Sequence, residues 1–188
     1  MATAVILLAD GFEEIETSTT FDILVRCGAE VKLAGLKRGI IRGSRGMRVQ
    51  PDTTVEKVKV DELDALILPG GYPGYENLRK SEHVKRLVRE AIEKGKLVGA
   101  ICAAPVVLAD AGVLQGKKCT VYPGFEEELK KAGAKVSDSL VVRDGNLITS
   151  RGPGTAFAFA LALAGALTGK ETVEKVKKET LADRGARF

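Results

Sequence analysis

Short apolar runs alternate along the chain with segments whose apolar residues recur every three or four positions. Runs of the first kind predict strands, and periodic segments of the second kind predict helices. We expect strands at residues 5–9, 31–35, 65–68, 97–101, 118–121, 140–143 and 146–149. Alternation of strands and helices predicts an α/β fold, with a mostly parallel sheet covered by helices on both faces.

Helix signals separate these strands. The clearest helix follows a capping Ser81, because apolar residues from Val84 onward recur at three- and four-residue steps. Glycine at position 28 predicts the end of the first helix. The helices are expected at residues 13–27, after Ser81, after Pro105, and at 155–167 and 172–181, with a small hairpin within 37–51 and an Asp144-Gly145 turn. No linker or repeat divides the chain, so we expect a single domain over residues 1–188.

Composition narrows the class of protein. The chain has 188 residues, of which 45% are hydrophobic, which is enough to build a core without disulfides or metals. Its 29 basic and 25 acidic residues are interspersed, which favours a solvated surface over a specific nucleic-acid partner. No segment has the length of a membrane span or the pattern of a signal peptide, so we expect a cytoplasmic protein. The three cysteines include no closely spaced pair, which argues against a disulfide framework and a metal site.

Polar or glycine-rich loops follow several predicted strands. In open parallel sheets, ligands bind beyond the carboxyl ends of the strands, so we expect these loops to converge on one place. They are DGFEEIE (residues 10–16), PGG (69–71), the turn at Cys102, and SRGPGT (150–155). The last loop opens a helix but lacks the lysine of a P-loop, so we expect a tight turn anchored by an arginine beside the site.

The thiol of Cys102 stands where a buried strand passes directly into a helix. Such a joint is typical of a nucleophile elbow, and the small neighbours Ala103 and Ala104 allow it. The helix dipole is expected to favour a thiolate, which would make Cys102 nucleophilic and easily oxidised. Cys27 lies in a helix stripe and Cys119 in a strand, so we expect both to be buried and inert.

An acid is the expected partner of this thiol. The only histidine, His83, lies beside the apolar stripe of an amphipathic helix, so a Cys-His pair is hard to build. Glu16 shares a helix face with apolar residues, which predicts an inward carboxyl with a raised pKa that can hand a proton to sulfur. Glu13 and Glu14 are expected to complement the helix dipole. Backbone N–H groups of Gly71 and Ala103 could form an oxyanion hole.

The motifs GFEEIET, LPGG, GAICAAP and TSRGPGT, in this order, resemble the ThiJ/PfpI superfamily, in the branch of the parkinsonism-associated protein deglycase and its bacterial ThiJ-like relatives. The resemblance implies a flavodoxin-like sandwich that is usually a homodimer and needs no cofactor. It implies a reactive Cys102 with Glu16 as the acidic partner, and backbone groups of Gly71 and Ala103 near an oxyanion. It also implies that Arg45 and Arg26 lie close to the site or to the dimer interface.

Two positions depart from the patterns of that superfamily. Ala103 replaces the histidine that follows the cysteine in the protease-like branch, so we do not expect peptidase activity. Tyr122 replaces a histidine usual in the deglycase branch. A phenol donates a hydrogen bond but is a poor base at neutral pH, which puts the catalytic rate in question.

Two functions are compatible with these residues. The first is a cofactor-independent glyoxalase or deglycase that acts on methylglyoxal-like dicarbonyls or on their adducts. The second is a redox-sensing stress-response or chaperone-like protein whose Cys102 is oxidised, with little turnover. A flavin-binding protein is disfavoured, because an acidic loop follows the first strand where a phosphate would need a loop rich in serine and threonine.

Overall fold

The computed structural model describes residues 1–184 and contains one seven-stranded sheet. Neighbouring strands are parallel except for the pair β10 and β11, so the prediction of a mostly parallel sheet is confirmed. In spatial order the strands are β10 (Val141–Asp144), β11 (Leu147–Ser150), β7 (Leu97–Ile101), β6 (Ala65–Leu68), β1 (Thr3–Leu8), β2 (Glu30–Gly35) and β5 (Thr53–Thr54).

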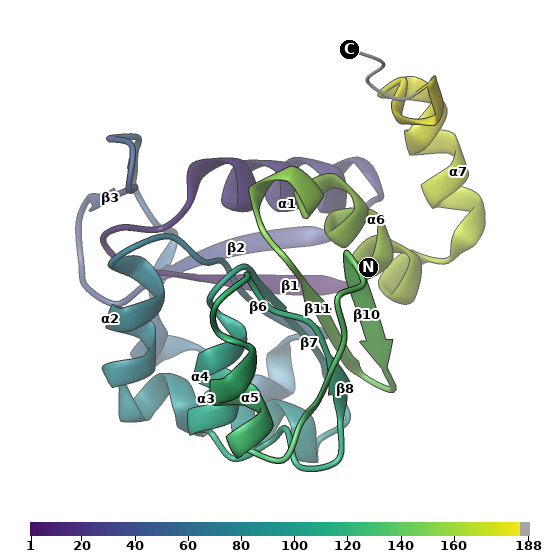
Figure 1. The fold of residues 1–188 in the computed structure, drawn as a ribbon. Coiled ribbons are helices and arrows are strands. Elements are labelled where there is room, and N and C mark those ends of the chain that lie inside the picture. The colour runs from purple at the N-terminus through teal and green to yellow at the C-terminus, as the bar shows by residue number, and fades with distance from the viewer. Residues whose placement is uncertain (185–188) are drawn as a thin grey trace.

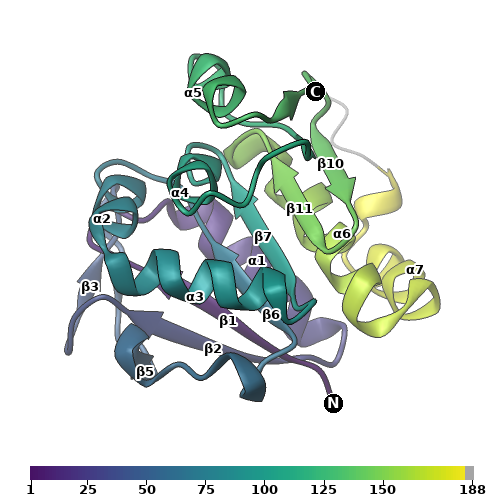
Figure 2. The same cartoon turned by 90° about the horizontal axis from the view of Figure 1, so that it is seen from below.

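Helices cover both faces of this sheet, which gives the three-layer arrangement seen in Figures 1 and 2. One face carries α1 (Glu14–Arg26) and α6 (Ala156–Thr168), with α7 (Lys170–Glu179) packed against α6. The other face carries α2 (Gly74–Lys80), α3 (Glu82–Glu93), α4 (Pro105–Asp110) and α5 (Glu126–Lys131). Short 3₁₀ turns lie at Val55–Lys57, Val60–Glu62, Pro153–Thr155 and Ala182–Arg184.

The central strands are buried on both sides, which is why they read as continuous apolar runs. In β1, Val5 and Leu7 enter the core on the α3 side, whereas Ile6 and Leu8 enter the core on the α1 side. This alternation follows from the two-residue period of a strand. The sequence of a strand buried on both sides therefore contains no polar face.

Most predicted elements are present, and the differences lie in short ones. Strands β6 and β7 have the predicted bounds, and Ser81 caps α3 by accepting a hydrogen bond from the N–H of Val84 at 3.3 Å. The predicted strand at 118–121 is reduced to β8 (Lys118–Cys119), which pairs with β9 (Lys135–Val136). The predicted hairpin is formed by β3 (Ile41–Arg42) and β4 (Arg48–Val49).

The short helices α2 and α5 were not predicted from the sequence. Helix α2 begins at Gly74, directly after Pro73, and these turn-forming residues predict a loop instead of the start of a helix. Helix α5 buries only Leu129 and therefore shows no apolar stripe. Within residues 1–184, no helix has the length and apolar character needed to cross a membrane.

Candidate active site

Cys102 occupies a strained backbone position between β7 and α4. Its φ of 63° lies in the left-handed region, which costs a residue other than glycine about 1–2 kcal/mol. The surrounding chain fixes this turn: the Cys102 N–H donates to the Ser150 carbonyl, and its carbonyl accepts from the Tyr122 N–H, both at 2.9 Å. The residue is half-buried, as an elbow requires, whereas Cys27 and Cys119 are buried in the core as expected.

Glu16 points inward from the first turn of α1. Helix α1 begins after Glu13, whose side chain caps it by accepting a hydrogen bond from the Glu16 N–H at 2.7 Å. The Glu16 side chain has 0% exposure, and its Oε2 accepts a hydrogen bond from the Gly70 N–H at 2.7 Å. Its Oε1 is buried without a hydrogen-bond partner among the described residues. The carboxyl thus lies under the loops, where the helix pattern placed it.

Gly70 is the point at which acid and thiol meet. A Cβ atom on Gly70 would lie 2.7 Å from the Cys102 Cβ, 3.0 Å from the Glu16 Oε2 and 3.2 Å from the Cys102 Sγ. Only glycine fits there, and its N–H is the donor that holds the acid. Sequence reasoning assigned the backbone role in the Pro-Gly-Gly turn to Gly71 and missed that of Gly70, since the motif does not show which glycine meets the helix.

Burial dominates the proton affinity of both groups. It raises the pKa of Glu16 to about 7, against the opposing effect of the Gly70 N–H, with further effects from Glu13 and Cys102. Burial, followed by the charge of Glu16, raises the pKa of Cys102 to about 12, although the N–H groups of Ala103 and Gly71 act in the opposite direction. The two groups compete for one negative charge and titrate as a unit.

This direction corrects one expectation. The sequence predicted a lowered pKa for Cys102, but its pKa is raised, because burial and the charge of Glu16 outweigh the lowering effect of the Ala103 and Gly71 N–H groups. A thiolate at neutral pH therefore requires the proton to be on Glu16, so that the carboxylate charge no longer opposes it. The N–H groups of Gly71 and Ala103 both approach the sulfur and would stabilise that form.

The loop at 150–155 is the expected tight turn. The Ser150 hydroxyl hydrogen-bonds to Thr155 at 2.6 Å, and Arg151 pairs with Glu126 at 3.6 Å. Tyr122 is 45% exposed, and its ring lies beside Gly152, where a Cβ atom would approach the Tyr122 Cδ2 to 3.2 Å. This turn and Tyr122 thus flank Cys102, to which both are joined by backbone hydrogen bonds.

Known proteins are similar to this chain over most of its length. The model of the DJ-1/PfpI family matches residues 2–166. This chain belongs to the DJ-1/PfpI family.

Two relatives in the DJ-1/PfpI family extend the similarity over most of the chain. Protein dj-1beta of Drosophila melanogaster is 45% identical over 95% of this chain and 96% of its own length. A deglycase of Pyrococcus abyssi is 41% identical over 82% of this chain and 92% of its own. The crystal structure of Drosophila DJ-1beta superposes with a TM-score of 0.92 at 44% identity, covering 96% of this chain and 97% of that one.

The two arginines expected from the family resemblance lie in different places. Arg45 is on the β3–β4 loop, where its N–H donates to the Glu14 Oε1 at 2.5 Å, so it is tied to the first turn of α1. Arg26 is in the last turn of α1, paired with Asp22 at 2.6 Å. Ten residues of helix rise by about 15 Å, so Arg26 lies at the end of α1 opposite to Glu16. Its place at a dimer interface stays a prediction.

Glu14 has a role that the sequence did not indicate. Its carboxylate reaches the β3–β4 loop and accepts hydrogen bonds from the Ser44 hydroxyl at 3.1 Å and from the Arg45 and Met47 N–H groups at 2.5 and 3.4 Å. Burial opposes its ionisation, but these donors outweigh burial and lower the pKa of Glu14. Two glutamates in the same helix turn thus have different roles: Glu14 holds the β3–β4 loop, and Glu16 lies beside the thiol of Cys102.

Proposed function

We propose that this DJ-1/PfpI family member is a cysteine-dependent, cofactor-independent enzyme of the glyoxalase or deglycase type that acts in the cytoplasm on methylglyoxal-like dicarbonyls or their adducts. The observation that carries the proposal is a half-buried thiol in a strained turn against a fully buried acid whose pKa is raised to about 7. The deglycase name of the Pyrococcus abyssi relative supports the same class.

The first step forms a bond between sulfur and the aldehyde carbon. With the shared proton on Glu16, the Cys102 thiolate adds to that carbon, and the carbonyl electron pair moves to oxygen. The N–H groups of Gly71 and Ala103 hold the resulting oxyanion. Glu16 then donates its proton to this oxygen, which leaves a neutral hemithioacetal and a Glu16 carboxylate.

The second stage moves a proton between adjacent carbons. The Glu16 carboxylate removes the proton from the carbon bound to sulfur, which gives an enediol, and returns that proton to the neighbouring carbon. The hydroxyl proton of the sulfur-bearing carbon passes to the oxygen of the neighbouring carbon, so the product is a thioester of a 2-hydroxy acid. Water cleaves the thioester, releasing the hydroxy acid and restoring the pair. Methylglyoxal and one water thus become lactic acid with no external oxidant or reductant. Tyr122 can donate a hydrogen bond to substrate, whereas base catalysis falls to Glu16.

Hydroxy-acid formation from methylglyoxal tests this proposal. We expect Cys102→Ser to lower kcat/KM by at least about a thousandfold, because the hydroxyl is a far weaker nucleophile without a base that ionises it. Cys27→Ala, which removes a buried thiol elsewhere, serves as the matched control and should retain activity. Equal rates for the Cys102→Ser variant and the unmodified protein would remove the proposal.

A second candidate function is redox sensing with little turnover, and a specific feature favours it. The Glu16 Oε1 is buried, has no hydrogen-bond partner among the described residues and belongs to the acid beside Cys102. A protonated Glu16 could donate to a sulfinic oxygen on that sulfur and halt oxidation there. Intact mass after mild peroxide treatment should show a two-oxygen gain that Cys102→Ser abolishes. Equal oxidation of all three cysteines would contradict this candidate.

We also propose that the protein is a homodimer. The outward face of α1 carries Ile15 and Val25, which are 54% and 46% exposed. The homodimer is what the resemblance to the family implies, and these two exposed side chains are the positions at which we test it. Light scattering on the purified protein should give twice the chain mass, and Ile15→Lys should shift it toward the monomer. A monomer in the unmodified protein would refute the dimer without affecting the thiol chemistry.

A further inference from the structure

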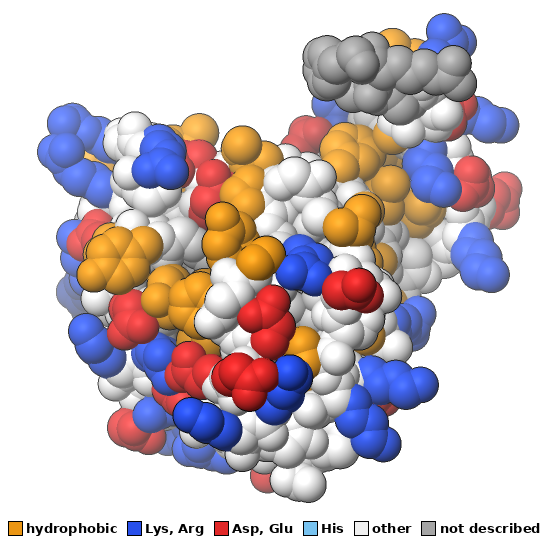
Figure 3. Space-filling view, in the orientation of Figure 1, with side chains coloured by type: hydrophobic (Ala, Val, Ile, Leu, Met, Phe, Trp, Pro, Cys, Tyr) orange, Lys and Arg blue, Asp and Glu red, His pale blue; other side chains and the backbone are white. Residues whose placement is uncertain are grey.

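One segment departs from the mixed charge of the rest of the surface. Residues 37–48, here called the basic hairpin, contain five basic and no acidic residues, namely Lys37, Arg38, Arg42, Arg45 and Arg48. The hairpin includes β3 and β4, and Figure 3 shows blue side chains gathered at the upper left, where β3 lies in Figure 1. A cluster of one sign raises the local concentration of oppositely charged ligands.

Most of this positive charge has no partner within the protein. Lys37 pairs with Asp10, but no carboxylate of the described chain lies within 4.0 Å of the side chains of the other four basic residues. By contrast, the single guanidinium group of Arg79 in α2 forms ion pairs with three carboxylates. The guanidinium groups of the basic hairpin are therefore available to an external anion.

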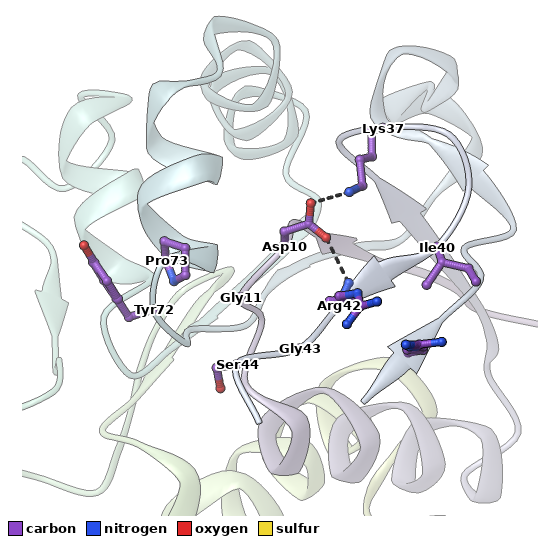
Figure 4. Close-up of a pocket in the computed structure, with 10 residues that line it drawn as sticks. Asp10, Gly11, Lys37, Ile40, Arg42, Gly43, Ser44, Tyr72 and Pro73 are labelled. Carbon is purple, nitrogen blue, oxygen red and sulfur yellow. Dashed lines mark hydrogen bonds and ion pairs between the residues drawn. The ribbon is translucent and has the colours of Figure 1, made fainter. Parts of the chain in front are cut away.

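Part of the basic hairpin lines a cavity of about 390 Å³. Lys37, Arg42 and Arg48 contribute to its wall, and Asp10 is the single acidic residue among the lining side chains. Asp10 is already occupied, because it accepts hydrogen bonds from Lys37 and from the Arg42 N–H, the latter at 2.9 Å (Figure 4). Three cations against one engaged carboxylate leave the cavity with net positive charge.

The cavity adjoins the loops that form the candidate active site. Tyr72 and Pro73 line it and directly follow Gly71, whose N–H approaches the sulfur of Cys102. Gly11 also lines it: its N–H donates to the Arg42 carbonyl at 2.6 Å, and a Cβ atom there would lie 2.4 Å from the Pro73 Cδ. The segments that meet around the acid and thiol thus also build the wall of the cavity.

The cavity wall is held in place before any ligand binds. The Ser44 N–H donates to the Phe12 carbonyl at 2.8 Å, and Glu14 accepts three hydrogen bonds from the loop of the basic hairpin. A wall fixed in this way loses little conformational freedom when a ligand enters. Arginine side chains offer pairs of N–H donors that match phosphate oxygens.

We propose that this cavity binds the phosphate group of the substrate, so that phosphorylated oxoaldehydes or their adducts are preferred over uncharged ones. The inference rests on the proposed function and names its substrate class. An anionic lipid headgroup has the same chemistry, and Ile40 and Met47 are exposed on the basic hairpin. The concave wall beside the reactive loops favours a small molecule over a membrane surface.

Binding is tested without reference to activity, by titrating inorganic phosphate and following the backbone amide signals of Arg42 and Gly43 by NMR. We expect saturable shifts, with a Kd that is at least about tenfold higher in the double variant Arg42→Gln/Arg48→Gln, because that variant removes charge-assisted hydrogen bonds to the phosphate. The control Arg86→Gln/Arg89→Gln removes the same charge from α3 and should bind phosphate normally. Absence of saturable shifts in the unmodified protein would overturn the inference.

Selectivity is tested with two substrates, methylglyoxal and 2,3-dioxopropyl phosphate. The ratio of kcat/KM for the phosphorylated over the uncharged substrate should exceed about ten, the effect of one charge-assisted contact, and fall about tenfold in Arg42→Gln/Arg48→Gln. If turnover depends on Cys102 but the ratio of the two kcat/KM values is the same in the double variant and in the unmodified protein, the inference fails while the proposed function stands. If no turnover depends on Cys102, the proposed function fails, and the phosphate titration still decides the site.

Binding to lipid vesicles tests whether the cavity recognises a lipid headgroup instead of a small phosphorylated substrate. Vesicles containing anionic phospholipid should bind the protein no better than neutral vesicles do. Strong binding that Arg42→Gln/Arg48→Gln abolishes, without any response to inorganic phosphate, would overturn the substrate site in favour of a membrane contact.

Discussion

Two regions of this molecule remove charged groups from water in opposite ways. Between α2, α4 and α5, the Arg79 guanidinium pairs with Asp110 at 2.9 Å, with Glu76 at 3.4 Å and also with Glu128. At the start of α1, Glu16 is fully buried, and no cationic side chain of the described chain lies within 4.0 Å of its carboxyl. In the first region a cationic side chain is paired with carboxylates, whereas in the second region a buried carboxyl has no cationic partner.

The consequence is a difference in proton affinity. Hydrogen bonds to Asp110 are the main reason that the pKa of Arg79 lies above its usual range, despite partial burial. Burial instead raises the pKa of Glu16 to about 7, so its proton is exchangeable near neutrality. Compensated charge stabilises a helix contact, whereas an uncompensated acid beside a thiol supplies a proton for chemistry.

The largest expected effect is on turnover. Glu16→Gln should lower kcat for methylglyoxal by about 10²–10⁴-fold, the usual contribution of a general acid and base. The same change removes the negative charge that raises the pKa of Cys102, so alkylation of Cys102 at pH 8 should become faster. Stopped assays and iodoacetamide labelling measure the two effects. A parallel fall in both rates would indicate a damaged site and contradict the acid-base role.

The next effect is on the pH dependence of stability. Because the folded-state pKa of Glu16, about 7, exceeds its ordinary value of 4.5, the neutral carboxyl favours the folded state. That stabilisation is fully present below pH 4.5 and is lost as the pH rises through about 7. A shift of this size corresponds to about 3 kcal/mol at pH 8.

Glu16→Gln keeps a neutral side chain at every pH. Urea unfolding should therefore show no advantage of Glu16→Gln at pH 4 and a gain of about 3 kcal/mol at pH 8. Glu82→Gln, in the exposed first turn of α3, is the control and should change the free energy of unfolding by less than about 0.5 kcal/mol. A gain that did not depend on pH would refute the raised pKa of Glu16.

A smaller loss is expected where charge is compensated. Arg79→Met should reduce the free energy of unfolding by about 2 kcal/mol, less than for a fully buried pair, because water partly screens this network. Turnover should remain within a few-fold of the unmodified protein. Arg86→Met removes an arginine without a carboxylate partner in the described chain and should have little effect in urea unfolding. A large loss of turnover with unchanged stability would reverse the contrast between the two regions.

The smallest effect concerns the backbone of Cys102. Its φ of 63° suits glycine, so Cys102→Gly should be more stable than Cys102→Ala by about 1 kcal/mol. Thermal unfolding of the two variants measures the difference without the complication of a reactive sulfur. Cys119→Gly and Cys119→Ala, in β8, should show the opposite order. Equal stability of the two Cys102 variants would mean that the turn stores no strain.

Much of the fold and part of the site could be predicted because their signals are local. Apolar runs fixed the positions of β6 and β7, and helix periodicity turned Glu16 inward. Short elements such as α5 escaped prediction because one buried residue gives no period. The direction of the pKa of Cys102 was also missed, since it depends on burial and on the charge of a residue distant in the sequence.

By itself, the sequence determined a mostly parallel sheet, a thiol at a strand-to-helix joint and an acid on the inner face of the first helix. These follow from repeats of two and 3.6 residues, which neighbours along the chain encode. Only the tertiary structure decided that Gly70 joins acid to thiol, since it lies 54 residues from Glu16, and that Asp10, Arg42 and Arg48 share one cavity. Contacts between distant segments depend on how the layers pack, and no local period encodes that.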